Sequence, residues 1–150
     1  MKIPEFKTAR QAYEYAAEYG RKLDAQEENL ISQDAFYSYY YACNVIKGKW
    51  ELGENAIIQD AQFSYLYANN VLKDRWELGE KIISEDEEYS YKYAKDVLKG
   101  RFELGENIIS QSAEYSYQYA KEVIKRRFEQ LAKCEAMQIA SEYKYIIKKY

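Results

Sequence analysis

One stretch decides the fold: Tyr91-Lys92-Tyr93-Ala94-Lys95-Asp96-Val97-Leu98-Lys99-Gly100-Arg101-Phe102-Glu103-Leu104-Gly105-Glu106. Closely similar text recurs before and after it at an interval of 26 residues, as between Tyr65 and Tyr91. The pair Tyr-x-Tyr marks the copies at Tyr13/Tyr15, Tyr39/Tyr41, Tyr65/Tyr67, Tyr91/Tyr93, Tyr117/Tyr119 and Tyr143/Tyr145. Self-similarity at a fixed interval is the sequence signature of a repeat protein. The chain is therefore predicted to consist of tandem repeats.

Each repeat is predicted to begin with a helix that is buried on more than one side. In the copy at residues 34–59, residues 37–49 are placed on a helix at about 100° per residue. One continuous arc of about 200° then holds Tyr37, Ser38, Tyr39, Tyr41, Ala42, Val45 and Ile46. Phe36, Tyr40 and Cys43 fall on the remaining arc. An apolar arc wider than the usual stripe of about 100° indicates burial by the repeats on both sides.

Local signals predict where this first helix begins and ends. One repeat position holds residues that can cap a helix N-terminus, namely Asp34, Asp60, Asp86 and Ser112. At the other end, Gly48 and Gly100 are predicted to take the left-handed conformation that stops a helix.

A second, shorter helix is predicted over residues 50–57. Leu52 and Gly53 are expected to face inward, and Glu51 and Glu54 to face solvent. A glycine inside a helix costs about 1 kcal/mol relative to alanine, so its recurrence indicates close approach of the preceding helix. The acidic pairs Glu51/Glu54, Glu77/Glu80 and Glu103/Glu106 are interpreted as helix starts that complement the helix dipole.

These patterns predict an all-α fold, an α-solenoid of 26-residue two-helix repeats that forms a single domain. Residues 1–33 are a leader and N-terminal cap unit, and residues 34–125 are the repeats. Residues 126–150 are predicted to form one long C-terminal capping helix, from about Arg126 to Lys148, because Arg126 and Leu131 replace the glycines of the pattern. Its apolar residues keep a helical period and would cover the open end of the solenoid.

Composition narrows the class of function. The net charge of −3 on 150 residues indicates neither a strongly basic nucleic-acid binder nor an acidic mimic of DNA. Cys43 and Cys134 lack the spacing of a zinc site or a disulfide framework, which fits a reducing compartment. The N-terminus lacks a signal-peptide core, and no apolar run is long enough to cross a membrane. A soluble, cytoplasmic protein without membrane contact is expected.

The sequence predicts a protein that is not an enzyme. It contains no histidine, no nucleophile elbow, no phosphate-binding glycine loop and no zinc-protease motif. Two carboxylates on one turn of a short helix provide too few oxygen ligands for a metal ion. We therefore expect no catalytic residues, no metal and no cofactor.

A basic ladder allows a nucleic-acid-binding alternative. It consists of Lys47, Lys73, Lys99 and Lys125, with Arg75, Arg101 and Arg127 nearby. Each copy places an aromatic residue beside the basic ones, as at Trp76 and Phe102, and such pairs can hold a phosphate backbone and stack bases. The aromatic residues fall on the predicted core face, so lysines that complement helix C-termini are the favoured interpretation.

The positions at which the copies differ predict a partner site. The exposed arc is apolar in the first full repeat and its neighbour, at Phe36, Tyr40, Cys43 and Leu66. In the third repeat the same arc carries Lys92, Lys95 and Asp96. An apolar patch at one end of a polar face can mark a partner site. The alternative is that residues 1–30 fold back and cover the patch.

The recurring string Y-x-Y-A-x-x-V-[LI]-K-x-[RK]-[WF]-E-L-G-E-x-[IA]-I over residues 30–130 resembles short helical tandem repeats of tailed-bacteriophage proteins. The architecture is also similar to TPR and Sel1-like solenoids. The resemblance implies a phage-encoded protein that acts in the host cytoplasm by binding a host protein, such as a component of a defence complex, which it would inhibit. A structural, self-assembling protein is a further alternative, because the ends of repeat arrays can stack.

Overall fold

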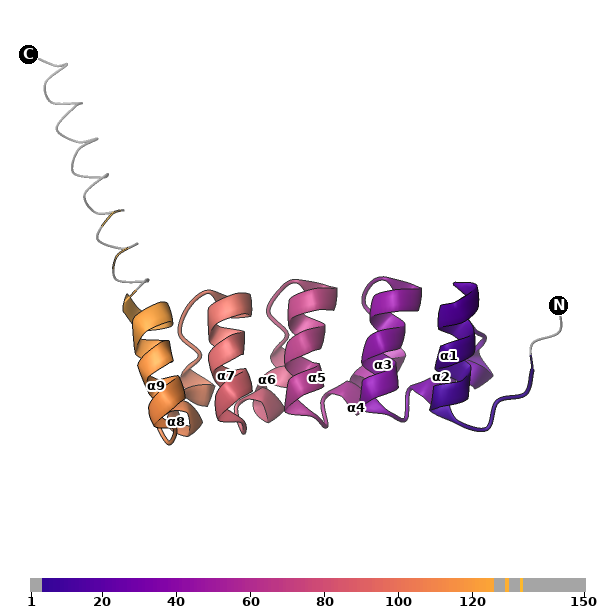
Figure 1. Cartoon of the computed structure of the whole chain (residues 1–150), viewed down its shortest axis with the longest axis horizontal. Coiled ribbons are helices and arrows are strands. Elements are labelled where there is room, and N and C mark those ends of the chain that lie inside the picture. Colours follow the sequence, from indigo (N-terminus) through magenta and orange to yellow (C-terminus); the bar gives the residue numbers. More distant parts are fainter. Residues whose placement is uncertain (1–3, 126–128, 130–132, 134–150) are drawn as a thin grey trace, which may run out of the picture.

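The computed structural model describes residues 4–125, together with Glu129 and Lys133. All regular structure in this part of the chain is helical, without a β-strand, which confirms the all-α class. The long helices stand side by side along the molecule, and the shorter helices form a second row behind them (Figure 1). None of the helices in the described ranges combines the length and the apolar character needed to cross a membrane.

Equivalent helices recur every 26 residues. The front row consists of α1 (Ala9–Tyr19), α3 (Ala35–Tyr41), α5 (Ala61–Leu66), α7 (Glu87–Lys92) and α9 (Ala113–Tyr119). Most of these helices continue into a π-helical segment: η1 (Ala42–Ile46), η2 (Tyr67–Leu72), η3 (Tyr93–Leu98) and η5 (Ala120–Ile124). The second row consists of α2 (Ala25–Ile31), α4 (Glu51–Ile57), α6 (Glu77–Ile83) and α8 (Glu106–Ile109), the last preceded by the 3-10 turn η4 (Glu103–Gly105).

The predicted N-caps are confirmed. Oδ1 of Asp34, Asp60 and Asp86 accepts a hydrogen bond from the backbone N–H three residues later, at 2.9 to 3.0 Å. Ser112 Oγ accepts the equivalent bond from Tyr115 N at 3.4 Å. These side chains satisfy a free N–H at each helix start.

The prediction for the opposite end of the helix is wrong by one residue. The left-handed residues are Lys47, Lys73 and Lys99, with φ of 59°, 56° and 50°. Gly48 N–H instead donates at 3.2 Å to Ala42 O, the carbonyl that also accepts from Lys47 N–H at the end of the π-helical segment. Because this role requires only an N–H, Asp74 performs it in the next repeat, where its N–H donates to Ala68 O.

The glycine in the second helix permits close packing, as expected. A Cβ at Gly53 would lie 2.4 Å from the Trp50 ring and 3.0 Å from Ser38 Cβ on the preceding helix. The buried core runs through every repeat and includes Tyr67, Ala68, Trp76 and Ile83. Each repeat thus buries its apolar face against the next repeat.

The N-terminal unit is more complete than its sequence suggested. Helix α2 occupies the position of a second helix and is capped by Asp24, whose Oδ1 accepts from Gln26 N and Glu27 N. Leu23 is buried where later repeats carry an aromatic residue. The predicted C-terminal capping helix lies outside the described residues, except for Glu129 and Lys133, which are helical.

Candidate functional site

A buried tyrosine joins each repeat to the next. Its hydroxyl accepts a hydrogen bond from a backbone N–H and donates one to a glutamate on the preceding second helix. The four sets are Tyr41 with Leu23 N and Glu28, Tyr67 with Trp50 N and Glu54, Tyr93 with Trp76 N and Glu80, and Tyr119 with Phe102 N and Glu106. These distances lie between 2.8 and 3.1 Å. A contact repeated in four places serves the scaffold.

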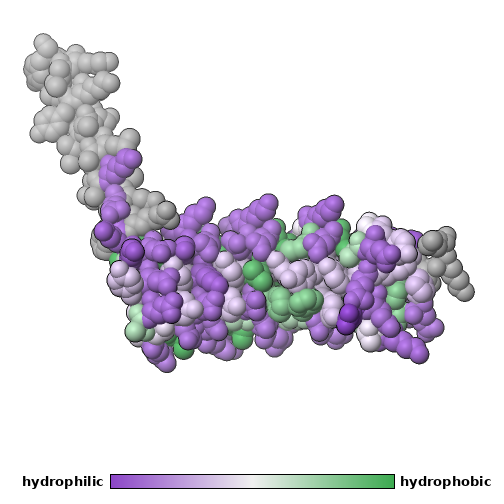
Figure 2. Space-filling model, viewed as in Figure 1, coloured by the Kyte–Doolittle hydropathy of each residue, from purple (hydrophilic) through white to green (hydrophobic). Residues whose placement is uncertain are grey.

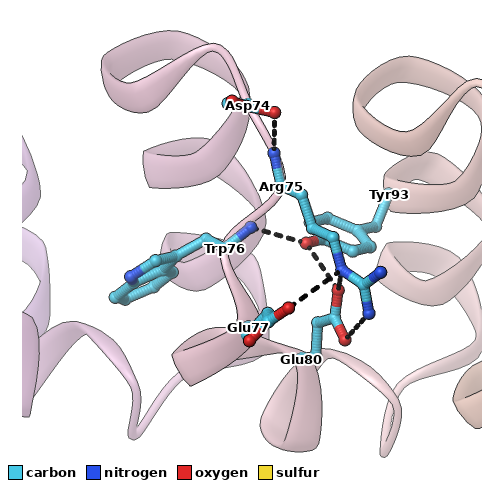
Figure 3. Close-up of polar contacts among 6 residues, drawn as sticks. All are labelled: Asp74, Arg75, Trp76, Glu77, Glu80 and Tyr93. Atoms are coloured by element: carbon cyan, nitrogen blue, oxygen red, sulfur yellow. Dashed lines mark hydrogen bonds and ion pairs between the residues drawn. The ribbon is translucent and has the colours of Figure 1, made fainter.

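An arginine completes this arrangement in two repeats. Arg75 Nε and Nη2 donate to the two carboxylate oxygens of Glu80 at 2.7 and 3.0 Å, beside the Tyr93 hydroxyl (Figure 3). Arg101 makes the same bidentate pair with Glu106, and its hydrogen bonds lower the pKa of that carboxyl. Both carboxylates are thus held by hydrogen bonds within the fold.

The second helix is rotated relative to the prediction. Glu54 was expected in solvent but is only 7% exposed, and Leu52 was expected inside but is 45% exposed. The Tyr67 hydroxyl holds the Glu54 carboxylate inside, which turns Leu52 outward. The constant spacing of 13 residues between each glutamate and its tyrosine was the sequence signal for this contact. Leu78 and Leu104 are exposed in the same way, at 65% and 61%.

In the structure, the residues of the predicted basic ladder fall into an exposed group and a group that forms ion pairs. Lys47, Lys73, Lys99 and Lys125 are exposed, whereas Arg75 and Arg101 are engaged with glutamates. The neighbouring aromatic rings of Trp50, Trp76 and Phe102 are only 3 to 6% exposed. Arg127 lies outside the described residues. Buried rings cannot stack on bases, so this arrangement lacks the aromatic platform of a single-strand binder.

Replacement of the three left-handed lysines by glycine tests whether these lysines serve the backbone conformation or bind nucleic acid. Glycine adopts positive φ without the steric cost of an L-residue, which is about 1 to 2 kcal/mol, but it loses more backbone entropy on folding. We expect the triple variant Lys47→Gly, Lys73→Gly, Lys99→Gly to gain about 0.5 kcal/mol per site in urea denaturation. Lys121→Gly, in the right-handed segment η5, is the control and should lose stability.

The same variants test the nucleic-acid hypothesis by fluorescence anisotropy with labelled RNA at low salt. The hypothesis is supported if the original chain binds the RNA and the triple variant does not. Absence of binding by the original chain would remove it.

The predicted apolar residues come together on the front face. Phe36 lies 4.6 Å from Tyr40 between ring centroids, and 5.7 Å from Phe63 of the next repeat. Phe36 is 44% exposed, while Tyr40, Cys43 and Leu66 are half-buried. Figure 2 shows hydrophobic side chains gathered on this face between α3 and α5. We call Phe36, Tyr40, Cys43, Phe63 and Leu66 the apolar cluster.

Phe63 was missed as a cluster residue by the sequence reasoning, which assigned its position to the core. The sequence did contain a signal for Phe63. The equivalent residues of the other repeats are Tyr37, Tyr89 and Tyr115, and only Phe63 lacks a hydroxyl at this position. The described leader, residues 4–30, leaves Phe36 exposed. It packs at the N-terminal end, where the Phe6 and Tyr15 rings lie 5.2 Å apart.

The charged residues predicted for the same face make contacts within the chain. Asp96 Oδ2 accepts a hydrogen bond from the Tyr65 hydroxyl at 2.8 Å, across one repeat boundary. Lys95 pairs with Glu122 at 3.0 Å and lies over the Tyr91 ring, and Lys92 pairs with Glu88. All three residues are half-buried. Asp96 belongs to a row of contacts between repeats that includes Asn44 with Tyr13 and Asn70 with Tyr39.

Comparisons with protein-family models, curated proteins and solved structures give no match to this chain.

Proposed function

We propose that this chain is an α-solenoid of 26-residue two-helix repeats that works as a non-enzymatic protein-binding module, with the apolar cluster as its docking surface. The exposure of Phe36 within this cluster carries the proposal. An aromatic residue with its ring partly in water is a typical anchor for a protein partner, because burial on binding removes apolar surface from water.

The charge distribution supports the choice of this surface. The third repeat places Glu88 and Lys92 at the positions of Phe36 and Tyr40, so the repeat fold does not require apolar residues there. In the third repeat, Glu88 and Lys92 form an ion pair with each other at these positions. Apolar residues confined to one part of the face are therefore better explained by binding than by folding.

The resemblance to phage repeat proteins makes a host protein the expected partner, and inhibition of a host defence complex the expected outcome. The chain would then act in the host cytoplasm. The structural roles of Glu54, Glu80 and Glu106 support a binding protein rather than an enzyme, because these carboxylates already accept hydrogen bonds from tyrosine hydroxyls.

The third repeat supplies the substitutions that test the docking surface. The double variant Phe36→Glu, Tyr40→Lys recreates the Glu88–Lys92 pair on α3 and is expected to change the free energy of unfolding by no more than about 1 kcal/mol. Pull-down from host lysate, with and without nuclease, is expected to lose its protein partner with this variant. The control, Glu88→Gln with Lys92→Gln, should retain the partner.

Two results would contradict the docking surface. A partner that the double variant still captures at full yield would place binding elsewhere on the molecule. A capture that disappears after nuclease treatment would show that nucleic acid, not a protein, mediates it.

A further inference from the structure

A hollow of about 500 Å³ lies between the second-row helices α2 and α4 and the residues that directly follow them. Its lining consists of Asn29, Ser32, Gln33, Leu52, Asn55, Ala56 and Gln59. All of these residues belong to the described part of the chain, and α9, near the end of its continuous range, lies at the opposite end of the molecule (Figure 1). The volume falls within the range of about 300 to 1,000 Å³ that is usual for ligand sites.

The hollow lies where one repeat has a small side chain in place of a large one. Ala56 occupies a repeat position that holds Leu30, Ile82 and Ile108 in the other copies, and these three residues are half-buried. A larger side chain at this position would extend into the hollow, because Ala56 is part of its lining. Leu52 also lines the hollow and is 45% exposed. The apolar part of the hollow therefore corresponds to the space of an absent branched aliphatic side chain.

Four exposed carboxamide side chains surround this apolar part. Gln33 Nε2 donates to Asn29 O at 3.3 Å and to Ser32 Oγ at 3.4 Å, and Gln59 Nε2 donates to Asn55 O at 3.4 Å. Within the described residues these are the only hydrogen bonds that the four carboxamides make, and none of them crosses from α2 to α4. A carboxamide offers two N–H donors and an acceptor oxygen. Most of the hydrogen-bonding capacity around the hollow thus faces solvent.

The lining contains no charged residue, although 31% of the residues in the chain are charged. The third repeat carries Lys81 and Glu85 at the positions of Asn55 and Gln59. A charged group covered by a neutral ligand would lose its hydration, so the α2–α4 hollow avoids a cost that Lys81 and Glu85 would impose. The lining also provides neither a cation for a phosphate nor an aromatic ring for a base, which disfavours nucleic acid.

We propose that the α2–α4 hollow binds an extended, uncharged peptide segment of a partner protein through one leucine or isoleucine side chain. This side chain takes the space over Ala56 and beside Leu52 that isoleucine occupies in the later repeats. The carboxamides bond the main chain on either side, because each peptide group offers an N–H and a C=O that a carboxamide complements. A helical segment would use these groups internally, so the bound segment is extended. The hollow is a second binding site, separate from the apolar cluster on the front-row helices.

Titration of the full chain with a neutral pentapeptide tests the site. The probe is acetyl-Ser-Ala-Leu-Ala-Ser-amide, and its matched control has glutamate in place of leucine. Proton–nitrogen correlation spectra report the side-chain NH₂ groups of Asn29, Gln33, Asn55 and Gln59 directly. We expect these four signals to shift to saturation with the leucine peptide and to stay in place with the glutamate peptide. Unmoved signals, or equal shifts with both peptides, would overturn the proposal.

Ala56→Ile fills the hollow with the residue of the later repeats. We expect this variant to lose the shifts caused by the leucine peptide. Its midpoint of urea denaturation should be at least that of the original chain, because the third and fourth repeats hold isoleucine at this position. Undiminished shifts in Ala56→Ile would overturn the proposal.

A second variant changes the rim and leaves Ala56 in place. Asn55→Lys with Gln59→Glu introduces the residues of the third repeat and should also abolish the shifts of the Asn29 and Gln33 signals. Shifts that persist at full size would show that the rim does not hold the peptide, and would overturn the proposal. Phe36→Glu with Tyr40→Lys, in the apolar cluster, is the control and should bind the peptide normally. Loss of a lysate partner by this control without loss of the peptide distinguishes the two sites.

Discussion

Raising the pH above about 10 is expected to unfold this protein in one steep transition. The six tyrosines with the most strongly raised pKa values are at most 8% exposed: Tyr39, Tyr41, Tyr65, Tyr67, Tyr93 and Tyr119. Burial is the first cause in every case, and it raises the pKa of Tyr39 and Tyr119 to about 12 from the ordinary 10.0. A buried phenolate would lie in a medium of low dielectric constant, beside a glutamate in four of the six cases.

The direction of the effect follows from the raised values. Below the unfolded pKa of 10.0 both states keep their phenolic protons, and the stability is fully present. Between pH 10 and about 12 only the unfolded chain loses these protons, so stability falls by about 1.4 kcal/mol per pH unit for each tyrosine. Six tyrosines together lower it by about 8 kcal/mol per pH unit, comparable with the total stability of about 5 to 15 kcal/mol of an ordinary domain.

Parallel measurements of tyrosinate absorbance and helical circular dichroism test this expectation. The absorbance of the six buried tyrosinates should appear only as the helix signal is lost, because burial raises the pKa of these tyrosines. Tyr117→Phe is the control and should leave the unfolding midpoint unchanged. Smooth titration of all tyrosines near pH 10 with the helices intact would show that the hydroxyls are accessible.

Replacement of Tyr67 by phenylalanine is expected to cost about 2 to 4 kcal/mol in the free energy of unfolding. The Tyr67 hydroxyl accepts from Trp50 N at 2.8 Å and donates to Glu54 at 3.1 Å. Its loss leaves a buried N–H and a buried carboxylate without this partner. Each unsatisfied buried group costs about 1 to 3 kcal/mol, and more where the group is charged.

Tyr93→Phe is a graded comparison and should cost less. Glu80 keeps its bidentate pair with Arg75, whereas the described residues provide no ion pair for Glu54. Urea denaturation of Tyr67→Phe, Tyr93→Phe and the exposed control Tyr117→Phe should therefore rank in that order of destabilisation. Equal effects at the two buried sites would show that the arginine does not compensate. An effect of Tyr67→Phe no larger than that of Tyr117→Phe would show that the hydroxyl contact contributes nothing.

The candidate site was predictable in part. Phe36, Tyr40 and Leu66 stood out because the copies differ there, and their rings and side chains do meet on one face. Lys92, Lys95 and Asp96 stood out for the same reason, yet they are engaged with residues of their own chain. The partners of Lys95 and Asp96 lie 27 and 31 residues away, on neighbouring repeats. A single helix projection contains no information about such neighbours.

The sequence by itself determined the all-α class, the 26-residue recurrence and the N-caps. Each of these depends on residues within one turn of a helix or on a pattern that repeats along the chain. Only the tertiary structure decided which face of the second helix is buried. A helix projection places Glu54 in water and Leu52 in the core, and the Tyr67 hydroxyl of the next repeat reverses both. The left-handed residue is Lys47 and not Gly48, because a π turn widens the end of the helix. The burial of Glu54 depends on a contact between segments that the local pattern does not describe, because a buried carboxylate is stable only where such a contact supplies its hydrogen bond.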